Sequence, residues 1–228
     1  RVLFRSHMDG HPRTGVLGCW VQTFGERTEV WHFRRWDNYS RNLMLFGVTV
    51  LCHPSWMVRR TLYERHPYDE AFCHIEDREW LARVAATERE VEFVALPRVL
   101  LDYRVHADSV TGRHQAAQQA RTGTIVARLL AAYGCPLSAP ELEQFMRVAF
   151  TRQCRADEIE PTGHLLRRIS AEVGRQLPDE HRVFREYWLK FCACNRVARD
   201  LANALFPAAD FQFLHYRELE PGTAHAVT

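Results

Sequence analysis

The hydrophobic periodicity of this 228-residue chain changes near His114. Before that position apolar residues alternate with polar ones in short runs, which is the pattern of half-buried β-strands. After it they recur about every 3.6 residues, which is the pattern of amphipathic helices, and strand signals almost vanish. The two patterns together exclude an all-α or an all-β fold. They predict an α/β domain followed by an α-helical region.

Four segments of the first half carry strand signals. Residues 15–24 and 30–33 flank a Gly-Glu-Arg turn at residues 25–27, and this arrangement predicts a β-hairpin. Residues 91–96 and 99–105 form two further predicted strands. Alternation in the last strand puts two sets of side chains on opposite faces: Val99, Leu101, Tyr103 and Val105 on one, and Asp102, Arg104 and His106 on the other.

Helix signals punctuate both halves of the chain. Residues 61–65 suit a short helical turn, and residues 78–86 suit a helix that Asp77 could cap. In the second half the first helix ends near Tyr133, before a glycine and a proline, and the next opens with a capping box from Ser138 to Glu141. Apolar spacing then continues helically through residues 184–205.

The ends of the chain are assigned separately from these two regions. Residues 1–10 are expected to be an artefactual or truncated lead, because residues 1–6 look like a translated sequencing adapter. Residues 11–114 form the α/β part and residues 115–219 the helical part. Residues 220–228 are small and polar with a Pro-Gly pair, so a frayed tail is expected there.

Composition narrows the classes of partner. Thirty basic residues against twenty-eight acidic ones give a net charge of +2, which supplies no basic stripe for phosphate contacts and argues against a nucleic-acid partner. The longest charge-free stretch, residues 42–58, is shorter than the ~20 apolar residues that span a bilayer. Seven cysteines, an odd number, suit a reduced cytoplasmic protein better than a secreted one.

An acidic pair, Glu76 and Asp77, marks the predicted start of the helix over residues 78–86. Acidic residues at a helix start commonly cap the helix and complement its dipole. The alternative is that one carboxylate projects into a cleft and acts as a general base, with a pKa tuned by the other. Spacing leaves both interpretations open.

Twelve histidines raise the question of a metal site. His53, His74 and His106 lie in the region that also carries Glu76, Asp77 and Asp102, but no pair has the HExxH spacing that specifies zinc. Scattered histidines are more often surface or core residues. Among them His106 is the best candidate because it ends a strand on its polar face.

Two aromatic features also have structural and functional interpretations. Tyr68, with Asp69 and Glu70 after it, could form a turn closed by an Asx-type hydrogen bond. Five tryptophans could stack on a sugar ring, although core packing is the commoner role: Trp20, Trp31, Trp36, Trp56 and Trp80.

Taken in order, the segments from Gly10 to Ser109 resemble the second half of a family 2 glycosyltransferase with the GT-A fold. They cover a little under half of the chain. The matching segments are His11-Pro12-x-x-Gly15-Val16-Leu17-Gly18, Leu45-Phe46-Gly47, His53-Pro54-Ser55-x-Met57-x-Arg59-Arg60, Tyr68-Asp69-Glu70-x-Phe72, Glu76-Asp77, and Leu96-Pro97-x-Val99-Leu100-Leu101-x-Tyr103-Arg104-Val105-His106-x-x-Ser109-Val110.

The resemblance implies roles for individual residues. Asp77 matches the carboxylate that these inverting enzymes use as catalytic base, and Glu76 would support the acceptor site. His106 matches a position near the donor diphosphate that contributes to the metal site in some relatives. His53, Arg104 and Trp80 would bind donor or acceptor, and Arg104 and His106 would open toward the same cleft as Asp77.

The resemblance also implies a partial, Rossmann-like GT-A domain with a mixed sheet. Residues 11–114 would be its acceptor-side half, and the nucleotide-binding strands and the Asp-x-Asp motif for Mg2+ or Mn2+ would precede this chain. The Gly-Gly that often precedes Tyr-Asp-Glu is His66-Pro67 here, so that turn must differ. The chain alone is expected to be inactive, with the apolar faces of residues 16–24 and 43–52 uncovered.

The resulting prediction is a fragment of a bacterial glycosyltransferase that moves a sugar from a nucleotide-sugar to an acceptor hydroxyl in surface polysaccharide or glycan synthesis. Its acceptor would be a glycan or a lipid-linked molecule, and its location the cytoplasm or the inner face of the membrane, reached by peripheral contact of the helical region. Two other classes stay open. One is a non-catalytic module that binds a glycan or partner; the other is a metal-dependent hydrolase built on His53, His74, Asp77 and His106.

Overall fold

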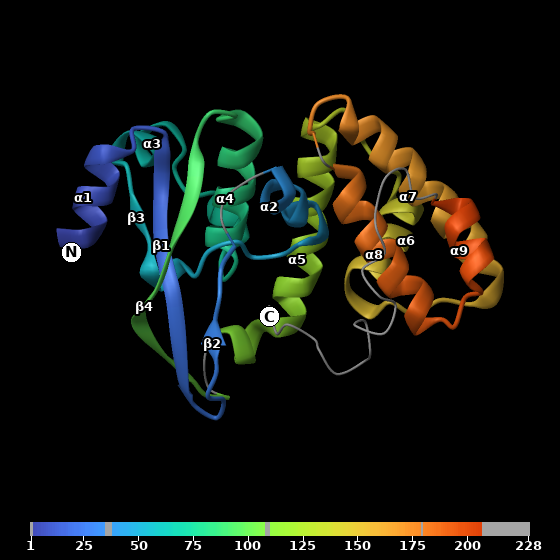
Figure 1. Cartoon of the computed structure of the whole chain (residues 1–228), viewed down its shortest axis with the longest axis horizontal. Coiled ribbons are helices and arrows are strands. Elements are labelled where there is room, and N and C mark those ends of the chain that lie inside the picture. Colours follow the sequence, from blue (N-terminus) through green and yellow to red (C-terminus); the bar gives the residue numbers. More distant parts are fainter. Residues whose placement is uncertain (1, 35–37, 108–109, 179, 207–228) are drawn as a thin grey trace. The chain divides into compact units, whose positions relative to one another are not determined.

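The computed structural model describes residues 2–34, 38–107, 110–178 and 180–206. The chain divides into two compact units, Arg1–Leu129 and Leu130–Thr228. The first is mixed α/β, and the described part of the second is helical, as the change of period predicted (Figure 1). The predicted tail at 220–228 lies outside the described residues.

Strand β1 (Thr14–Gly25) is the centre of a four-stranded mixed sheet. On one side it pairs antiparallel with β2 (Val30–Trp31) and β3 (Met57–Val58), and on the other it pairs parallel with β4 (Glu92–Val105). The β1–β2 pairing confirms the predicted hairpin. A parallel pair needs a long crossover, and the helical segment between β3 and β4 supplies it.

Strand β4 is continuous, whereas two strands were predicted at 91–96 and 99–105. Leu96 pairs with Cys19 and Val99 pairs with the next residue of β1, Trp20, so Pro97 and Arg98 are extra residues in the ladder. Proline lacks the N–H that a ladder needs and normally ends a strand pattern. Here the irregularity absorbs it, and the strand continues on the same neighbour.

Five α-helices belong wholly or mainly to the first unit: α1 (Val2–Gly10), α2 (Asn38–Leu43), α3 (Arg60–Arg65), α4 (Glu76–Thr87) and α5 (Val110–Ala132). Three 3-10 turns join them: η1 (Met44–Phe46), η2 (His53–Ser55) and η3 (Glu70–Phe72). The helices expected at 61–65 and 78–86 are confirmed. Helix α4 starts earlier than expected, with Ile75 at its N-cap, so Asp77 lies inside the first turn and does not cap the helix.

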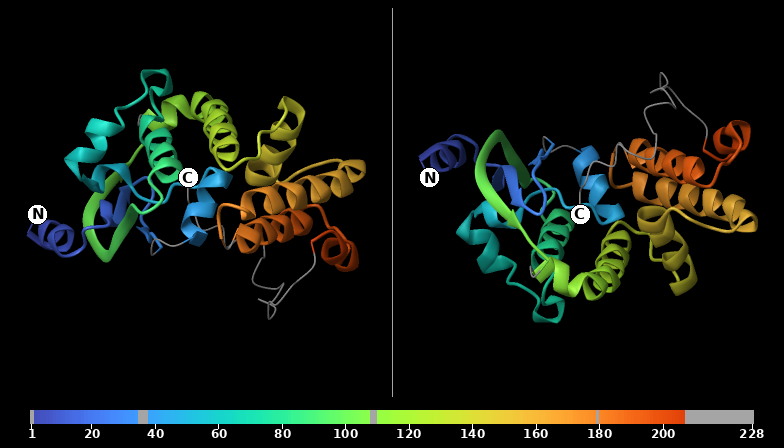
Figure 2. Two further views of the ribbon diagram at one scale, coloured as in Figure 1. Left: turned by 90° about the horizontal axis from the view of Figure 1, so that it is seen from above. Right: turned by 90° about the horizontal axis from the view of Figure 1, so that it is seen from below.

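Helices α1 and α4 lie on opposite sides of the sheet (Figures 1 and 2). Residues 1–10, expected as an artefactual or truncated lead, include α1, whose Met8 packs in a cluster with Leu17, Cys19 and Leu96. The guanidinium of Arg59 donates to the carbonyl oxygen of Met8 at 2.6 Å. This segment is therefore packed and hydrogen-bonded onto the sheet.

Most of the apolar residues expected to be uncovered are buried, although Phe24 is 46% exposed. In β1 the side chains of Val16, Leu17 and Val21 have no exposed surface. In the run over residues 43–52, Leu45 and Leu51 are at most 1% exposed. The first unit thus encloses these faces with its own helices and turns, and the expectation of bare apolar faces was wrong.

The second unit contains α6 (Ala139–Met146), α7 (Ile159–Gly174), α8 (Glu180–Cys194) and α9 (Arg199–Leu205). A π-helical turn, η4 (Arg147–Thr151), continues α6, and a 3-10 turn, η5 (Ala156–Glu158), precedes α7. The capping box predicted at Ser138 and Glu141 is present, with the Ser138 amide donating to Glu141 Oε2 at 2.8 Å. The helical period predicted through residues 184–205 is interrupted between α8 and α9, where Arg196 has φ 53°, and Leu201 is 40% exposed.

None of the helices in the described part of the chain has the length and apolar composition that crossing a membrane requires.

Candidate functional site

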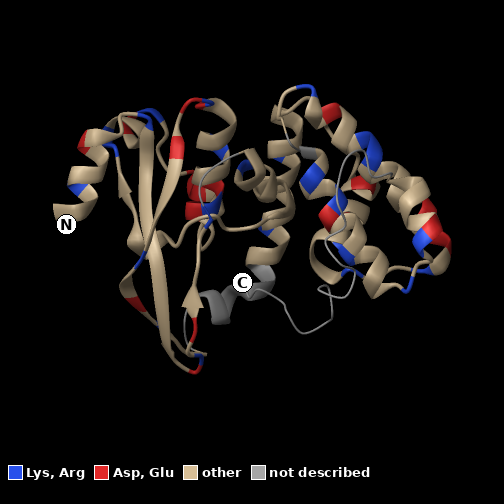
Figure 3. Cartoon of the chain, in the orientation of Figure 1, with Lys and Arg blue, Asp and Glu red and all other residues tan. Residues whose placement is uncertain are grey.

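Glu76 and Asp77 occupy the first turn of α4. Acidic residues gather at this end of the helix, where its dipole favours negative charge (Figure 3). The preceding His74 has φ 70°, a left-handed conformation that turns the chain into the helix. Asp77 Oδ1 accepts a hydrogen bond from the Arg78 amide at 2.7 Å. Both carboxylates are half-buried, so they remain open to solvent or a ligand.

The carboxylate of Asp77 acts electrostatically on groups from three other segments. Burial raises the pKa of the Cys52 thiol, at the N-cap of η2, to about 12, and the charges of Cys19 and Asp77 add to the shift. Burial also raises the pKa of Tyr103 in β4, again with contributions from Cys52 and Asp77. The pKa of Tyr68 rises through burial, its hydrogen bond to Tyr63, and the charges of Asp77 and Glu76. Groups in η2, in the 66–69 loop and in β4 therefore lie within electrostatic range of Asp77.

Arg78 is a half-buried cation beside this carboxylate. Its two terminal nitrogens donate to hydroxyls, Nη1 to Thr122 at 3.1 Å and Nη2 to Thr49 at 3.0 Å. Burial lowers the pKa of the guanidinium and the Asp77 charge raises it. Arg78 thus fixes the start of α4 to two other segments while placing a positive charge next to Asp77.

Trp80 lies beneath the site and packs in the core. Its side chain has no exposed surface, and Nε1 donates to the His66 carbonyl oxygen at 2.5 Å. Three aromatic rings surround it, with centroid distances of 4.9 Å to Tyr63, 6.0 Å to Trp56 and 6.3 Å to Tyr68. Trp80 was predicted to bind donor or acceptor, but other aromatic rings cover it and its side chain does not reach the surface.

His53 lies at the exposed edge of this aromatic group. Its ring is perpendicular to that of Trp56 at 4.7 Å, and Nε2 is 3.4 Å from the Tyr68 hydroxyl. The Tyr68 hydroxyl is in turn 3.0 Å from the Tyr63 hydroxyl. Tyr68 thus lies beside His53 and within electrostatic range of Glu76 and Asp77. We call the rings of His53, Trp56, Tyr63, Tyr68 and Trp80 the aromatic platform.

Arg104 and His106 do not join this group. Strand alternation puts neighbouring side chains on opposite faces, and Tyr103 is the one that senses Asp77, so Arg104 lies on the other face. Arg104 and His106 are both exposed, as the alternating pattern predicted. The expectation that they share a cleft with Asp77 was wrong for this reason. The end of β4 is tied instead to the hairpin turn, with the Ala107 amide donating to Glu26 Oε1 at 2.9 Å.

Candidate metal ligands do not assemble within the described part of the chain. No group of three or more His, Cys, Asp or Glu side chains there could hold a metal ion. His53, His74, Asp77 and His106, all described, are not part of such a group, and a hydrolase built on them stays a prediction.

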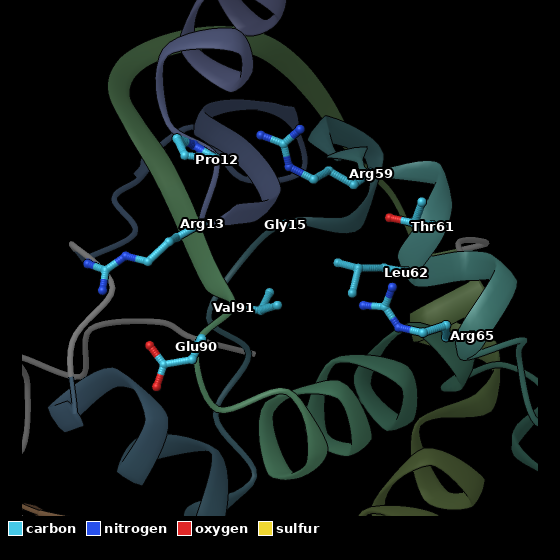
Figure 4. Close-up of a pocket in the computed structure, with 9 residues that line it drawn as sticks. All are labelled: Pro12, Arg13, Gly15, Arg59, Thr61, Leu62, Arg65, Glu90 and Val91. Carbon is cyan, nitrogen blue, oxygen red and sulfur yellow. The ribbon is translucent and has the colours of Figure 1, made fainter.

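A separate pocket of about 320 Å3 lies at the other end of the sheet (Figure 4). Its lining residues are Pro12, Arg13, Gly15, Arg59, Thr61, Leu62, Arg65, Glu90 and Val91. None of the predicted site residues is among them. Its arginines serve the fold: Arg65 pairs with Glu88 at 2.9 Å, and Arg13 with Glu92 at 2.7 Å.

Sequence reasoning missed two contributors to the site. Tyr63 and Tyr68 flank the His66-Pro67 turn that departs from the family pattern, and their meeting depends on how that turn folds. The Asx-type bond predicted for the turn at Tyr68, Asp69 and Glu70 is present, with Asp69 Oδ1 accepting from the Ala71 amide at 3.1 Å. Tyr68 begins the Tyr68-Asp69-Glu70-x-Phe72 segment that resembles the family, and its place in that segment was the available sequence signal.

Comparison with known proteins adds no relative: no family model, no curated protein and no solved structure matches this chain.

Proposed function

We propose that the first unit is the acceptor half of an inverting family 2 glycosyltransferase with a GT-A fold. In this proposal the enzyme moves a sugar from a nucleotide-sugar to an acceptor hydroxyl during surface polysaccharide or glycan synthesis in a bacterium. One observation carries the proposal. Segments far apart in the chain that resemble the family, those with Cys52-His53, Tyr68 and Tyr103, each carry a group within electrostatic range of Asp77.

The chemistry assigned to the carboxylates follows from their position. A hydroxyl is a poor nucleophile until a placed base takes its proton. Asp77, half-buried at the start of α4, would accept that proton, and Glu76 would accept a hydrogen bond from the acceptor and orient it. Arg78, the next residue along α4, places a positive charge beside Asp77.

Mg2+ or Mn2+ would act as a Lewis acid at the leaving diphosphate in such an enzyme. The described residues do not fit that ion, since no group of three or more His, Cys, Asp or Glu side chains among them could hold a metal. No step of the reaction is therefore assigned to a metal here. The nucleotide-sugar would be held by residues other than those described.

A second candidate is a non-catalytic glycan-binding module. The exposed ring of Tyr68 and the neighbouring His53 favour it, because aromatic faces next to carboxylates bind sugars without any need for turnover. No observation favours the hydrolase. The two remaining candidates share a ligand class and differ in whether Asp77 performs chemistry.

Substitution of Asp77 separates them. Release of nucleoside diphosphate from a panel of UDP-, GDP- and dTDP-sugars would be measured with the product of the complete gene. Asp77→Asn should lower kcat by about 100-fold or more and leave the donor KM nearly unchanged, because a positioned base contributes that much. Asp157→Asn, in an exposed ion pair with Arg155, is the matched control. An unchanged kcat in Asp77→Asn contradicts the assignment.

A cytoplasmic site of action, at or near the inner face of the membrane, belongs to the same proposal because lipid-linked acceptors reside there. Activity in separated cytoplasmic and membrane fractions of the source cell tests it. Activity confined to a secreted fraction would contradict it.

A further inference from the structure

Side chains from other segments bind the loop on both sides of Tyr68. Trp80 donates to the His66 carbonyl at 2.5 Å, and Arg83 Nη2 donates to the Pro67 carbonyl at 2.7 Å. On the other side of Tyr68, the Arg128 guanidinium lies 3.2 Å from Asp69 Oδ2. Such contacts fix the backbone before any ligand arrives, so the ring can bind without an ordering cost.

Part of the aromatic platform is exposed to solvent. Tyr68 is 38% exposed and His53 is exposed, while Tyr63 and Trp56 are half-buried and Trp80 is covered. A large, rigid ring with two rotatable bonds is a low-entropy contact surface for another ring. Neighbouring rings are inclined to one another by 34° to 70°, so what the platform offers at the surface is the exposed ring of Tyr68 with the His53 imidazole beside it.

The charge around Tyr68 selects among possible ligands. The carboxylates of Asp77 and Glu76 both act on its hydroxyl. The two cations that hold the loop are already paired, Arg83 with Glu79 at 2.8 Å and Arg128 with Asp69. Arg78 places one positive charge next to the two carboxylates, so a phosphate here would still meet a net negative charge, whereas a neutral sugar would donate its hydroxyls to the carboxylates.

We propose that the aromatic platform seats a neutral pyranose ring of the acceptor glycan, stacked on Tyr68 with its hydroxyls directed toward Glu76 and Asp77. The assignment of that sugar as the acceptor rests on the proposed function; the seat itself does not. Under that assignment, the group that receives the transferred sugar is a hydroxyl of a neutral sugar and not a lipid phosphate.

Saturation-transfer NMR on the purified 228-residue chain tests the seat without any donor. The probes are the neutral disaccharides maltose, lactose and cellobiose at millimolar concentration, with glucose phosphate as the charged comparison. At least one disaccharide should bind, and Tyr68→Ala should weaken its Kd by roughly 10-fold, the factor that about 1.4 kcal/mol of lost contact gives. Glucose phosphate should bind more weakly than the disaccharide that binds best.

Two variants guard against a folding artefact. Tyr68→Phe keeps the ring and should keep Kd within about 3-fold, a change that corresponds to a single modest hydrogen bond. Phe150→Ala removes a ring that is 41% exposed in the second unit and should leave binding unchanged. Absence of binding by all three disaccharides, binding that survives Tyr68→Ala, or tighter binding of the phosphate ester would each overturn the seat.

The outcome also separates the seat from the proposed function. Disaccharide binding that depends on Tyr68, together with no transfer from any nucleotide-sugar by the complete protein, would retain the seat and remove the transferase. Transfer that depends on Asp77 but accepts only a lipid phosphate would retain the transferase and overturn the assignment of the seated sugar as the acceptor.

Discussion

The Nε1 of Trp80 is hydrogen-bonded to the carbonyl oxygen of His66. This bond joins the buried floor of the aromatic platform to the loop that precedes Tyr68. It explains why a tryptophan is needed in α4, because no other aromatic side chain combines this bulk with an N–H donor at its edge. The surface ring is thus positioned by a residue that a ligand never touches.

Trp80→Phe should destabilise the protein by about 1 to 3 kcal/mol, since it leaves a buried carbonyl without its donor. Trp80→Ala should cost about 3 to 5 kcal/mol through the cavity it creates. Urea unfolding followed by circular dichroism gives both values. Trp31→Phe is a suitable control, because Trp31 is half-buried and bonds to the side chain of Glu29. A Trp80→Phe variant as stable as wild type would contradict the positioning role.

Gly15→Ala should destabilise the first unit. A Cβ at Gly15 would lie 2.5 Å from Val91 Cγ1 and 2.6 Å from Leu62 Cδ1, and overpacking of this kind costs about 1 to 3 kcal/mol. Gly10→Ala is the matched control, since nothing lies within 4 Å of a Cβ there. In α1 that change should be neutral or stabilising by up to about 1 kcal/mol. Gly15→Ala should therefore lower the midpoint temperature of thermal unfolding, whereas Gly10→Ala should leave it unchanged or raise it. Equal shifts in the two variants would contradict this prediction.

Arg59→Lys should release α1 from the sheet. The Arg59 guanidinium donates to the carbonyl oxygens of Thr14, Met8 and His11, at 2.8, 2.6 and 3.1 Å. An ammonium group cannot reproduce this planar fork. Hydrogen exchange in residues 2–10 should accelerate by about 10-fold or more, which corresponds to roughly 1.4 kcal/mol of lost local stability. Arg60→Lys, whose side chain is 91% exposed, should leave the exchange unchanged.

Glu88 should make stability depend on pH at the acidic end. Hydrogen bonds from His66 and then Arg65 hold the pKa of this carboxyl below its ordinary value of 4.5. A carboxyl with a depressed folded-state pKa stabilises the fold above the unfolded pKa, and that stabilisation is lost as pH falls through the folded value. Glu88→Gln should therefore be less stable than wild type at neutral pH, and the difference should shrink below pH 4.5. Glu64→Gln, in an exposed pair with Arg60, is the control and should change stability by at most about 1 kcal/mol at neutral pH.

Local patterns sufficed to predict the elements whose signals are short-range. The hairpin of β1 and β2, helices α3 and α4, and the capping box at Ser138 all depend on residues within one or two turns of each other. Strand β4 could not be predicted as one strand, because Pro97 looks like a break until the partner strand and its shifted register are known.

The candidate site was predictable only in part. The motif around Glu76 and Asp77 placed them correctly at a helix start, and His53 lies near them. The role of Trp80 could not be read from spacing, because burial depends on the rings that close over it. Arg104 was misassigned since alternation gives the two faces of a strand but not which face the start of α4 approaches.

The irregularity at Pro97 and Arg98 also affects whether the edge of the sheet can pair with strands of other molecules. Strand β4 pairs with β1 along one side, and no strand in the described residues pairs with its other side. A straight, open edge of this length is a template on which further chains can add. Proline interrupts its row of donors, Arg98 adds a charge, and the shifted ladder bends the edge away from a flat partner. Residues that looked like the end of a strand therefore discourage the sheet from growing between molecules.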